Sequence, residues 1–562
     1  MKSDQRTRWK ILPPVPKSYL EASGVTDLVA QLLYSRGVGL EQVEPFLAVD
    51  DRLEGNPFLL PDISEAVGRV YRAVLAREKV AVYGDFDVDG VTAAAIVAEG
   101  LSRLGAETIV YIPDRFEEGH GLNGSAIDKL HARGADLVIT VDCGVTDVAE
   151  VGRAKELGID MIITDHHVPS QSLPRAVAVV DPKRRDSRYP HPDLAGAGVA
   201  FKLVQALFHR DRRERWLSEL MDLVALATVT DMSPMIGENR YLVNEGLKEL
   251  NTSSRPGIQE MVSLAGLRPG ELDGDDISWV LGPRLNAAGR LDSASTSYRL
   301  LTTRSTEEAR RLAQELEVRN AERQKLSSEV LEHARQRLVD KLHLPLLLAG
   351  DESYSVGIIG PVAGRLLDEF YKPVVVVTLG SELCKGSCRS VAEFDMVEAL
   401  GDCSDLLTAF GGHAMAAGFT VPRENLAGLE DRLIGLAGEK LSHLDLRPEL
   451  AVDAEVPLSA FTGDTFNLIQ ELSPFGRGNP KPTFLTRHVE VAGGRNFGSK
   501  REWLRLKLRQ GSVTWRAVDF VSQMKAKDVP RYIDIVYNLE RSRWNGEEVL
   551  GLNLRDLAAS RI

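Results

Sequence analysis

The sequence has few cysteines and no long apolar run. Only four cysteines occur among the 562 residues, and no Cys/His spacing completes a zinc site. We therefore expect reduced thiols rather than a disulfide framework. No stretch of about 18 apolar residues is present, which argues against a membrane-spanning helix, and the first residues lack the apolar segment of a signal peptide. These absences predict a cytoplasmic protein made of ordinary folded domains.

The net charge of −13 is, by itself, unfavourable to a nucleic-acid partner. The segment from Arg477 to Arg509 differs from the rest, because it contains nine Lys or Arg and two Asp or Glu. Aromatic residues such as Phe497 and Trp503 are interleaved with these charges. A local basic and aromatic surface can bind a nucleic acid although the whole chain is acidic. The alternative interpretation of this segment is an ordinary solvated face.

The length predicts three or four domains of roughly 100–200 residues each. From about 65 to 235, short β-rich apolar runs alternate with segments whose apolar residues recur with the helical period. Buried strands alternating with helices predict a doubly wound parallel α/β sheet. Residues 306–341 are highly charged and contain no Gly or Pro, which predicts a long helix capped by Ser305 that bridges two domains.

Two further folded regions are expected after this helix. A second, smaller α/β block follows it, and after about residue 450 short strand-like runs separated by turns predict a small antiparallel barrel. The expected division is an N-terminal helical segment (1–45), a catalytic α/β domain (46–305), the connecting helix (306–341), a substrate-binding α/β domain (342–445) and a nucleic-acid-binding barrel (446–562).

Three predicted strands of the first α/β block end in acids or histidines. The residues concerned, with one acid that follows a later apolar run, are Asp85, Asp87, Asp89, Asp142, Asp165, His166, His167 and Asp231. Each alone could be a turn residue or a helix cap. Because the carboxyl ends of parallel strands lie on one edge of a sheet, we expect these side chains to converge there.

Clustered carboxylates indicate a metal site for an electrostatic reason. Several carboxylates held together raise one another's pKa and cost free energy unless a cation neutralises them. Carboxylate oxygens combined with imidazole nitrogens suit Mn²⁺, and carboxylates alone suit Mg²⁺. Two such ions about 3.5–4 Å apart can activate water and stabilise charge on a phosphoryl group. The sequence therefore predicts a metal-dependent phosphoesterase.

Several long motifs resemble a known family. YGDFDVDG, VDCG and the Asp-His-His at 165–167 resemble the DHH phosphoesterase superfamily. Within it, PDRFEEGHGL (113–122), LGPRLNAAGRLD (281–292), CKGSCRS (384–390) with FGGHAMAAGF (410–419), and SPFGRGNPKPTF (473–484) resemble the RecJ family. The resemblance covers about residues 65–560. It implies a DHH domain, a DHH-associated domain and an OB-fold-like barrel. It also implies a 5′→3′ exonuclease that hydrolyses single-stranded DNA to 5′-mononucleotides in DNA repair and recombination.

The resemblance also implies roles for individual residues. Two ions, Mn²⁺ or Mg²⁺, would be held by Asp85, Asp87, Asp89, Asp142, His166 and Asp231. His167 would support this catalytic site or contact a substrate phosphate, and the division of ligands between the two ions stays open. The expected substrate-binding residues are Arg284, Asn286, Arg290, Ser387, Arg389, Gly412 and His413.

Alternative functions differ in substrate or in catalysis. One is a DHH phosphoesterase acting on short oligoribonucleotides or cyclic dinucleotides, and the other is a non-catalytic DNA-binding scaffold. The barrel disfavours the first, and the complete ligand set disfavours the second. The resemblance further implies a monomer that works beside single-strand-binding protein and a helicase. One departure is Tyr354-Ser355, where many relatives have Trp-His, so any role carried over to these two positions is in doubt.

Overall fold

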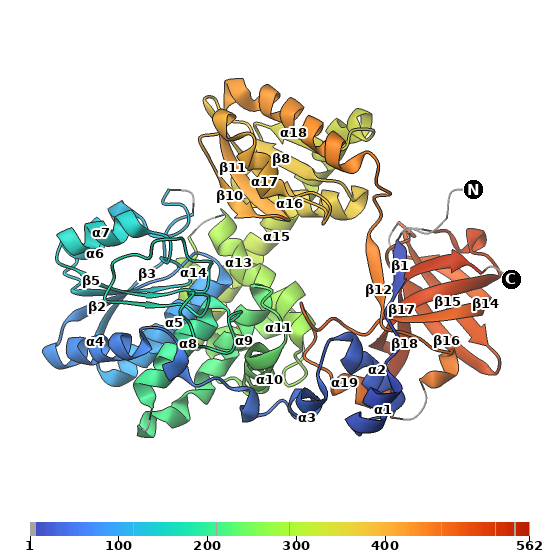
Figure 1. The fold of residues 1–562 in the computed structure, drawn as a ribbon, viewed down its shortest axis with the longest axis horizontal. Coiled ribbons are helices and arrows are strands. Elements are labelled where there is room, and N and C mark those ends of the chain that lie inside the picture. Colours follow the sequence, from blue (N-terminus) through green and yellow to red (C-terminus); the bar gives the residue numbers. More distant parts are fainter. Residues whose placement is uncertain are drawn as a thin grey trace.

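The computed structural model describes residues 7–115, 117–209, 211–291, 293–461, 464–498, 500–522, 524–544 and 547–560, and the side chains of 542–548 lie outside this description. Asp292, the last residue of one motif that resembles the RecJ family, also lies outside the described residues. The described chain forms a first α/β domain, a long helix, a second α/β domain and a barrel (Figure 1).

The first α/β domain contains a five-stranded parallel sheet in the order β3-β2-β4-β5-β6. Its strands are β2 (Lys79–Tyr83), β3 (Glu107–Tyr111), β4 (Leu137–Val141), β5 (Asp160–Thr164) and β6 (Ala178–Val180). One face is covered by α4 (Ile63–Ala76), α5 (Val88–Leu104) and α8 (Gly196–Phe208), and the other by α6 (Gly124–Ala132) and α7 (Val148–Glu156) (Figure 1). Helices on both faces of a parallel sheet confirm the doubly wound prediction.

A helical region completes the first domain. Its elements are α9 (Met221–Thr230), α10 (Gly237–Thr252), α11 (Pro256–Leu264), α12 (Gly274–Asp276), a π-helical turn (Ile277–Leu281), α13 (Gly282–Leu291) and α14 (Ser295–Thr302). Helix α9 is apolar on all sides, and its residues from Met221 to Val229 are buried, as expected for a helix inside a core.

The predicted long helix is α15 (Thr306–Leu338). The Ser305 hydroxyl accepts a hydrogen bond from the Glu308 backbone N–H at 3.2 Å, which confirms the cap. The Glu308 carboxylate turns instead to the Thr303 hydroxyl, so the reciprocal half of the capping box is absent at this helix. Helix α15 packs against α11 and α13 of the first domain and against α16 (Val356–Phe370) of the second, so it joins the two.

The second α/β domain has a mixed sheet in the order β10-β11-β9-β8-β7. The strands are β7 (Leu347–Asp351), β8 (Val374–Thr378), β9 (Leu383–Arg389), β10 (Ala409–His413) and β11 (Ala416–Pro422), and helices α16, α17 (Met396–Gly401) and α18 (Leu426–Leu441) accompany them. Only β7 and β8 run parallel within it. Cys384, Cys388 and Cys403 are buried as free thiols in this domain, which agrees with the expected reduced cysteines.

The C-terminal region is a closed five-stranded barrel. Its strands, in order around the barrel, are β14 (Phe484–Phe497), β15 (Trp503–Gln510), β16 (Val513–Asp519), β18 (Glu547–Ala559) and β17 (Tyr532–Trp544), and β17 pairs back with β14. The expectation of an all-antiparallel barrel is wrong at one pair, because β16 and β18 run parallel. A closed ring with an odd number of strands cannot alternate direction throughout, so at least one parallel pair is required.

The N-terminal segment packs against the barrel. It contains the expected helices α1 (Lys17–Ser23), α2 (Asp27–Ser35) and α3 (Val43–Ala48), and a strand that was not predicted, β1 (Arg8–Ile11), which pairs in parallel with β12 (Glu449–Val452). Leu32 and Phe46 from these helices share one hydrophobic core with Phe484 and Leu506 of the barrel. Figure 1 shows β1 beside the barrel strands β17 and β18.

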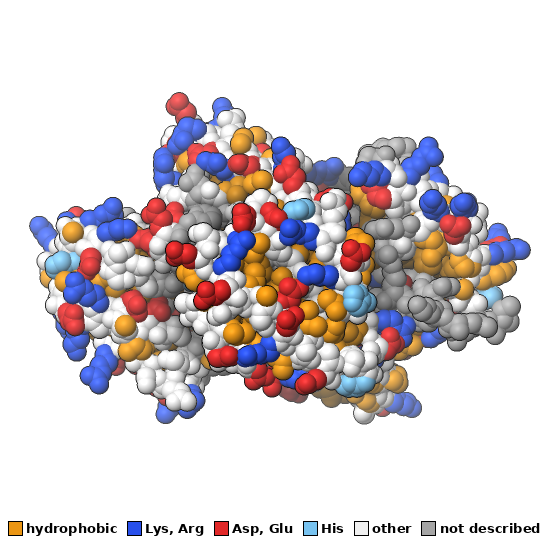
Figure 2. Space-filling model, turned by 90° about the horizontal axis from the view of Figure 1, so that it is seen from above, with side chains coloured by type: hydrophobic (Ala, Val, Ile, Leu, Met, Phe, Trp, Pro, Cys, Tyr) orange, Lys and Arg blue, Asp and Glu red, His pale blue; other side chains and the backbone are white. Residues whose placement is uncertain are grey.

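The surface carries charges of both signs. Viewed from above, Lys and Arg side chains are interspersed with Asp and Glu and with hydrophobic patches (Figure 2). On this face, therefore, the basic side chains of the described residues do not form one continuous area. Among the described residues, no helix combines the length and the apolar character that crossing a membrane requires.

Candidate metal centre

The carboxyl ends of β2, β4 and β5 meet in one polar cavity of about 250 Å³. Its lining includes Asp85 and Asp87 after β2, Asp142 after β4 and the His166-His167 pair after β5. Asp231 reaches the same cavity from the end of α9. The parallel sheet thus brings together residues that are far apart in sequence, as its geometry dictates.

Three overlapping clusters in this cavity have the spacing of metal ligands. In each cluster the candidate ligand atoms lie within 4.8 Å of one another. The clusters are Asp142–His166–His167, Asp89–His166–Asp231, and Asp85–Asp87–Asp142. His166 and Asp142 each occur in two of the three clusters, which links the clusters into one set of candidate ligands.

Surrounding groups hold the ligands in place. The Asp89 carboxylate accepts hydrogen bonds from the backbone N–H groups of Gly196 and Ala197, both at 2.7 Å, at the start of α8. His166 Nδ1 lies 3.0 Å from the Leu194 carbonyl oxygen and donates to it. This bond leaves the lone pair of His166 Nε2 pointing to the carboxylates, with Asp142 Oδ1 3.1 Å away.

The backbone around Asp142 is unusual. Asp142 adopts a left-handed conformation (φ 61°), which is costly for a residue with a Cβ and is found most often at functional sites. A Cβ atom at Gly196 would lie 2.6 Å from the Asp142 Cβ, so only glycine permits α8 to approach this closely. The turn therefore places the Asp142 carboxylate at the centre of the cavity.

The electrostatics of the carboxylates fit a bound cation. Asp85 Oδ1 and Asp142 Oδ1 are buried without a hydrogen-bond partner, a costly arrangement for a carboxylate that no cation neutralises. Burial and the neighbouring acids raise the pKa of Asp87 and Asp142 above the ordinary range, and raise the pKa of Asp89 to about 7. The carboxylate oxygens with the His166 imidazole nitrogen form a donor set suited to Mn²⁺, and the carboxylates alone suit Mg²⁺.

His167 is held by the acid of its own motif. Its Nδ1 lies 2.8 Å from Asp165 Oδ1, and this hydrogen bond raises the pKa of His167 to about 9. Burial opposes ionisation of Asp165, but its contacts with His167 and with the Val145 N–H hold the pKa of Asp165 below its usual value. His167 is therefore a half-exposed cation at neutral pH. Sequence reasoning gave Asp165 no role of its own, although its place directly before the two histidines was a usable signal.

Arginines approach the carboxylates from neighbouring elements. Arg290 of α13 is close enough to Asp87, Arg115, Arg323 and Arg389 to interact electrostatically with all four. Burial, Arg115 and Arg323 together lower the pKa of Arg290 to about 10. Arg115 was missed from the sequence. It lies in the loop after β3, at the same sheet edge as the acids, with its guanidinium 5.0 Å from the centre of the Phe86 ring.

The other predicted substrate residues occupy different positions. Ser387 and Arg389 lie on β9, while Gly412 and the exposed His413 lie on β10 at the edge of the second sheet. Arg290 Nη1 donates to the Gly357 carbonyl at 3.3 Å, so α13 touches the start of α16 in that second domain. This contact joins α13 to the second domain, and Arg389 of that domain lies within electrostatic range of Arg290.

Arg284 and Asn286 make contacts that sequence reasoning did not foresee. The Arg284 guanidinium pairs with Glu317 of α15 at 2.6 Å and donates to the Val280 carbonyl, which favours a role in holding α13 against α15 rather than binding substrate. Asn286 Oδ1 accepts from the Val88 N–H at 3.2 Å, beside Asp87 and Asp89.

Tyr354 and Ser355 mark the departure from the family pattern. Tyr354 is 2% exposed and packs edge-on against His333 of α15, so it belongs to the core rather than to a stacking surface. Ser355 precedes α16 as its N-cap and makes no side-chain cap hydrogen bond.

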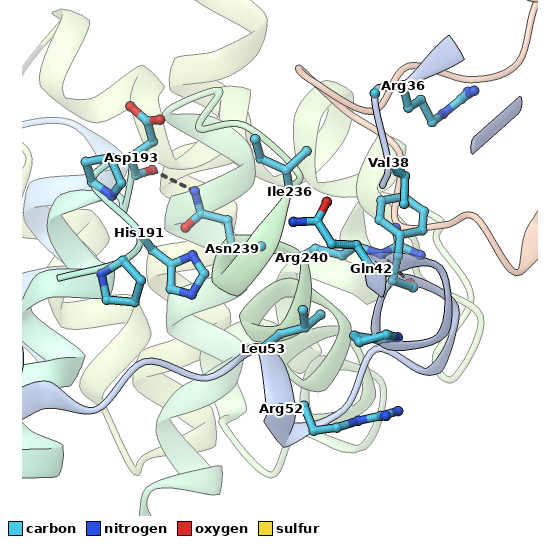
Figure 3. A pocket seen from close by; sticks show the side chains of 16 residues that line it. Arg36, Val38, Gln42, Arg52, Leu53, His191, Asp193, Ile236, Asn239 and Arg240 are labelled. Carbon is cyan, nitrogen blue, oxygen red and sulfur yellow. Dashed lines mark hydrogen bonds between the residues drawn. The ribbon is translucent and has the colours of Figure 1, made fainter. Parts of the chain in front are cut away.

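A larger cavity, of about 510 Å³, lies away from the carboxylates (Figure 3). It is found where the N-terminal segment meets the first domain, and its lining includes Arg52, His191, Asn239 and Arg240. In Figure 3, Asn239 donates to the Asp193 carbonyl, a bond of 2.6 Å. The Arg240 guanidinium donates to backbone carbonyls of Phe46 in the N-terminal segment and of residues 471–474 before the barrel, so this cavity marks a junction between parts of the chain.

Comparison with known proteins agrees with this geometry. Three family models match: "DHH family, N-terminal domain" at residues 79–228, "DHHA1 domain" at 339–439 and "RecJ OB domain" at 452–556. The single-stranded-DNA-specific exonuclease RecJ of Bacillus subtilis is 37% identical over 567 residues, which covers 99% of this chain and 71% of that protein.

Solved structures of RecJ from Thermus thermophilus are similar over the whole fold. The crystal structure in complex with Mn²⁺ has a TM-score of 0.85 at 30% identity and covers 99% of this chain and 80% of that one. The complex with Mg²⁺ has a TM-score of 0.77 at 28% identity, with coverage of 99% and 79%. By its sequence and its fold, therefore, the chain belongs to the RecJ family.

Proposed function

We propose that this protein is a metal-dependent exonuclease that hydrolyses single-stranded DNA from the 5′ end and releases 5′-mononucleotides. The observation that carries the proposal is the juxtaposition of a buried carboxylate–histidine cavity with arginines from two domains. Carboxylates suit divalent ions, and arginines suit the phosphates of a substrate. The RecJ relatives are named as single-stranded-DNA-specific exonucleases, which supports the choice of substrate.

Each group in the site has a proposed task. Asp85, Asp87, Asp89, Asp142, His166 and Asp231 would hold two ions, which supply Lewis-acid stabilisation of phosphoryl charge when bound. Arg290 and Arg389 hold the phosphate beside the scissile bond, and cationic His167 neutralises further charge on its oxygens. Asp165 positions His167, and Asn286 positions the backbone next to Asp87.

The second domain would recognise the 5′ end. We assign this task to Ser387, Arg389, Gly412 and His413, which lie on β9 and on the edge strand β10. Gly412 has a φ of 133°, and a Cβ there would lie 2.5 Å from the Ala416 carbonyl oxygen, so only glycine fits this place in the pairing of β10 with β11.

The barrel would extend the DNA track. Phe497, Trp503 and Phe520 form a cluster of rings whose centres lie 5.4–6.0 Å apart, and Trp503 and Phe520 are exposed. The Arg505 guanidinium lies 4.6 Å from the centre of the Phe497 ring. Exposed rings beside arginines are the combination with which proteins bind single strands without sequence preference.

The cellular setting is also part of the proposal. We expect a cytoplasmic monomer that acts in DNA repair and recombination beside single-strand-binding protein and a helicase. Light scattering would test the monomer, and affinity capture with the purified partners would test the contacts.

The test is an end-labelling assay. Single- and double-stranded DNA and RNA, labelled at the 5′ or the 3′ end, are incubated with Mn²⁺, Mg²⁺ or a chelator. We expect 5′-label to leave single-stranded DNA first as mononucleotide, with either ion and not with the chelator. Release of the 3′-label first, or equal hydrolysis with the chelator, would refute the proposal.

The same assay separates the two alternatives. Preferential hydrolysis of short oligoribonucleotides or cyclic dinucleotides would favour another DHH phosphoesterase, and DNA binding without hydrolysis would favour a scaffold. The six candidate ligands in the overlapping clusters argue against the scaffold, and the barrel argues against the short substrates.

A further inference from the structure

Trp279 is exposed to an extent that packing does not explain. Its side chain is 77% exposed, compared with 38% for Trp503 and 48% for Phe520 on the barrel. A large aromatic ring left in water gives up the free energy that its burial would provide. An exposed tryptophan held on a helical segment is therefore a candidate for contact with a ligand.

The helix that carries Trp279 presents it on a defined face. Trp279, Pro283, Asn286 and Arg290 are spaced by four, three and four residues, which places them on one side of the continuous helical segment 274–291. Ile277 and Leu281, on the other side of the helix, are 0% exposed and belong to the core of the first domain.

This face connects the metal cavity with the barrel. At its far end Arg290 faces Asp87 and Arg389, and Asn286 bonds to the backbone beside Asp87. At the N-terminal end of this helical segment, Asp275 forms an ion pair with Lys481, which lies just before the barrel strand β14. Along the helix axis, Trp279 lies about 10 Å from Asn286 and about 16 Å from Arg290.

The local backbone supports a special role for this position. Residues Ile277–Leu281 form a π-helical turn between two α-helical segments. Such turns are rare, occur mostly as single insertions and are frequent at functional sites.

We propose that Trp279 stacks on a base of the single-stranded DNA between the metal centre and the barrel. It would form a subsite for a nucleotide several positions from the scissile bond. Stacking on a ring suits any base, which matches a nuclease that must accept every sequence. A protein partner fits less well, because the same helix face leads directly into the arginines around Arg290. The inference rests on the proposed nuclease function.

The experiment compares Trp279→Ala with Trp279→Phe and with Leu75→Ala. Leu75 is 83% exposed on α4 and serves as a control for loss of a surface apolar side chain. Initial rates with Mn²⁺ are measured on a dinucleotide and on a 20-nucleotide strand. We expect Trp279→Ala to raise KM for the long strand about 5- to 100-fold, the range for loss of one stacked base, with kcat nearly unchanged. Trp279→Phe should recover most of the loss, and Leu75→Ala should match wild type.

The dinucleotide separates stacking from a structural role. It is too short to reach from the metal centre to Trp279, so its hydrolysis should be the same in every variant. An unchanged KM for the long strand in Trp279→Ala would overturn the inference, and so would an equal loss on both substrates. If the wild-type protein hydrolyses neither substrate, the nuclease proposal itself fails, which is a different result.

Discussion

The two α/β domains have sheets of different kinds, and the site takes different residues from each. The first sheet is entirely parallel, so the ends of β2, β4 and β5 meet at one edge and supply acids and histidines. The second sheet is mixed and carries the proposed substrate-binding residues, with Ser387 and Arg389 on β9 and His413 on β10. The parallel sheet brings acidic side chains together in one buried cavity, which suits a cation. The second sheet presents hydrogen-bond donors along its strands, which suits the phosphates of a nucleic-acid strand.

Replacing a ligand on the parallel sheet should have the largest effect. Asp142→Ala removes the carboxylate shared by two clusters, so kcat/KM for single-stranded DNA should fall on the order of 10³-fold or more. Circular dichroism should be unchanged, and Tm in chelator should not fall, because an unpaired buried carboxylate oxygen is removed. A variant with wild-type activity would contradict the assignment of Asp142.

Replacing a cation on the second sheet should act on substrate binding instead. Arg389→Ala should raise KM about 10- to 100-fold, the range for loss of a charged hydrogen bond, while the concentration of Mn²⁺ for half-maximal activity stays the same. Arg284→Ala is the matched control, since Arg284 is paired with Glu317. It should lower Tm with little change in KM. If both variants raise KM equally, the distinction drawn between these two arginines is wrong.

Salt should weaken DNA binding moderately. Phosphates that meet arginines release counterions, and for single strands the slope of log K against log salt is about −0.7 per phosphate contact. About three contacts would reduce affinity roughly 20-fold between 50 and 200 mM salt. The slope should become shallower in Arg389→Ala than in Arg284→Ala. A salt-independent affinity would exclude phosphate contacts as the basis of binding.

The smallest expected effect is a pH-dependent change in stability. Burial and Asp231 raise the pKa of Asp89 to about 7, so without metal the folded state loses stability as pH rises toward and through 7. Mn²⁺ binds the ionised carboxylates, and it should therefore raise Tm more at pH 8 than at pH 5.5, by about 2–4 °C. Calorimetry with Mn²⁺ or chelator at both pH values measures this difference in Tm. An equal rise in Tm at both pH values would show that the carboxylates do not take up protons in the absence of metal.

The sequence predicted most of the first sheet and its cavity. The apolar runs, the acids after them and the rule for parallel strands were sufficient, because β2, β4 and β5 are neighbours whose carboxyl ends share one edge. The long helix was also predictable, since its charge pattern and Ser305 cap are local features.

Other features could not be predicted from the local sequence pattern. Strand β1 pairs with β12 from the opposite end of the chain, and the helices after it complete the barrel's core. The pairing of Arg284 with Glu317 and the meeting of Arg115, Arg290 and Arg389 depend on how separate elements pack. Tertiary packing decides these contacts, and no single segment of sequence encodes them.

The most direct test of the metal centre is anomalous diffraction from crystals of the protein grown with Mn²⁺. We predict two anomalous peaks about 3.5–4 Å apart in the cavity, surrounded by the carboxylates and His166 of the three clusters. Crystals of Asp142→Ala should lack at least one of them. Peaks elsewhere on the molecule, or no peak among these carboxylates, would contradict the account.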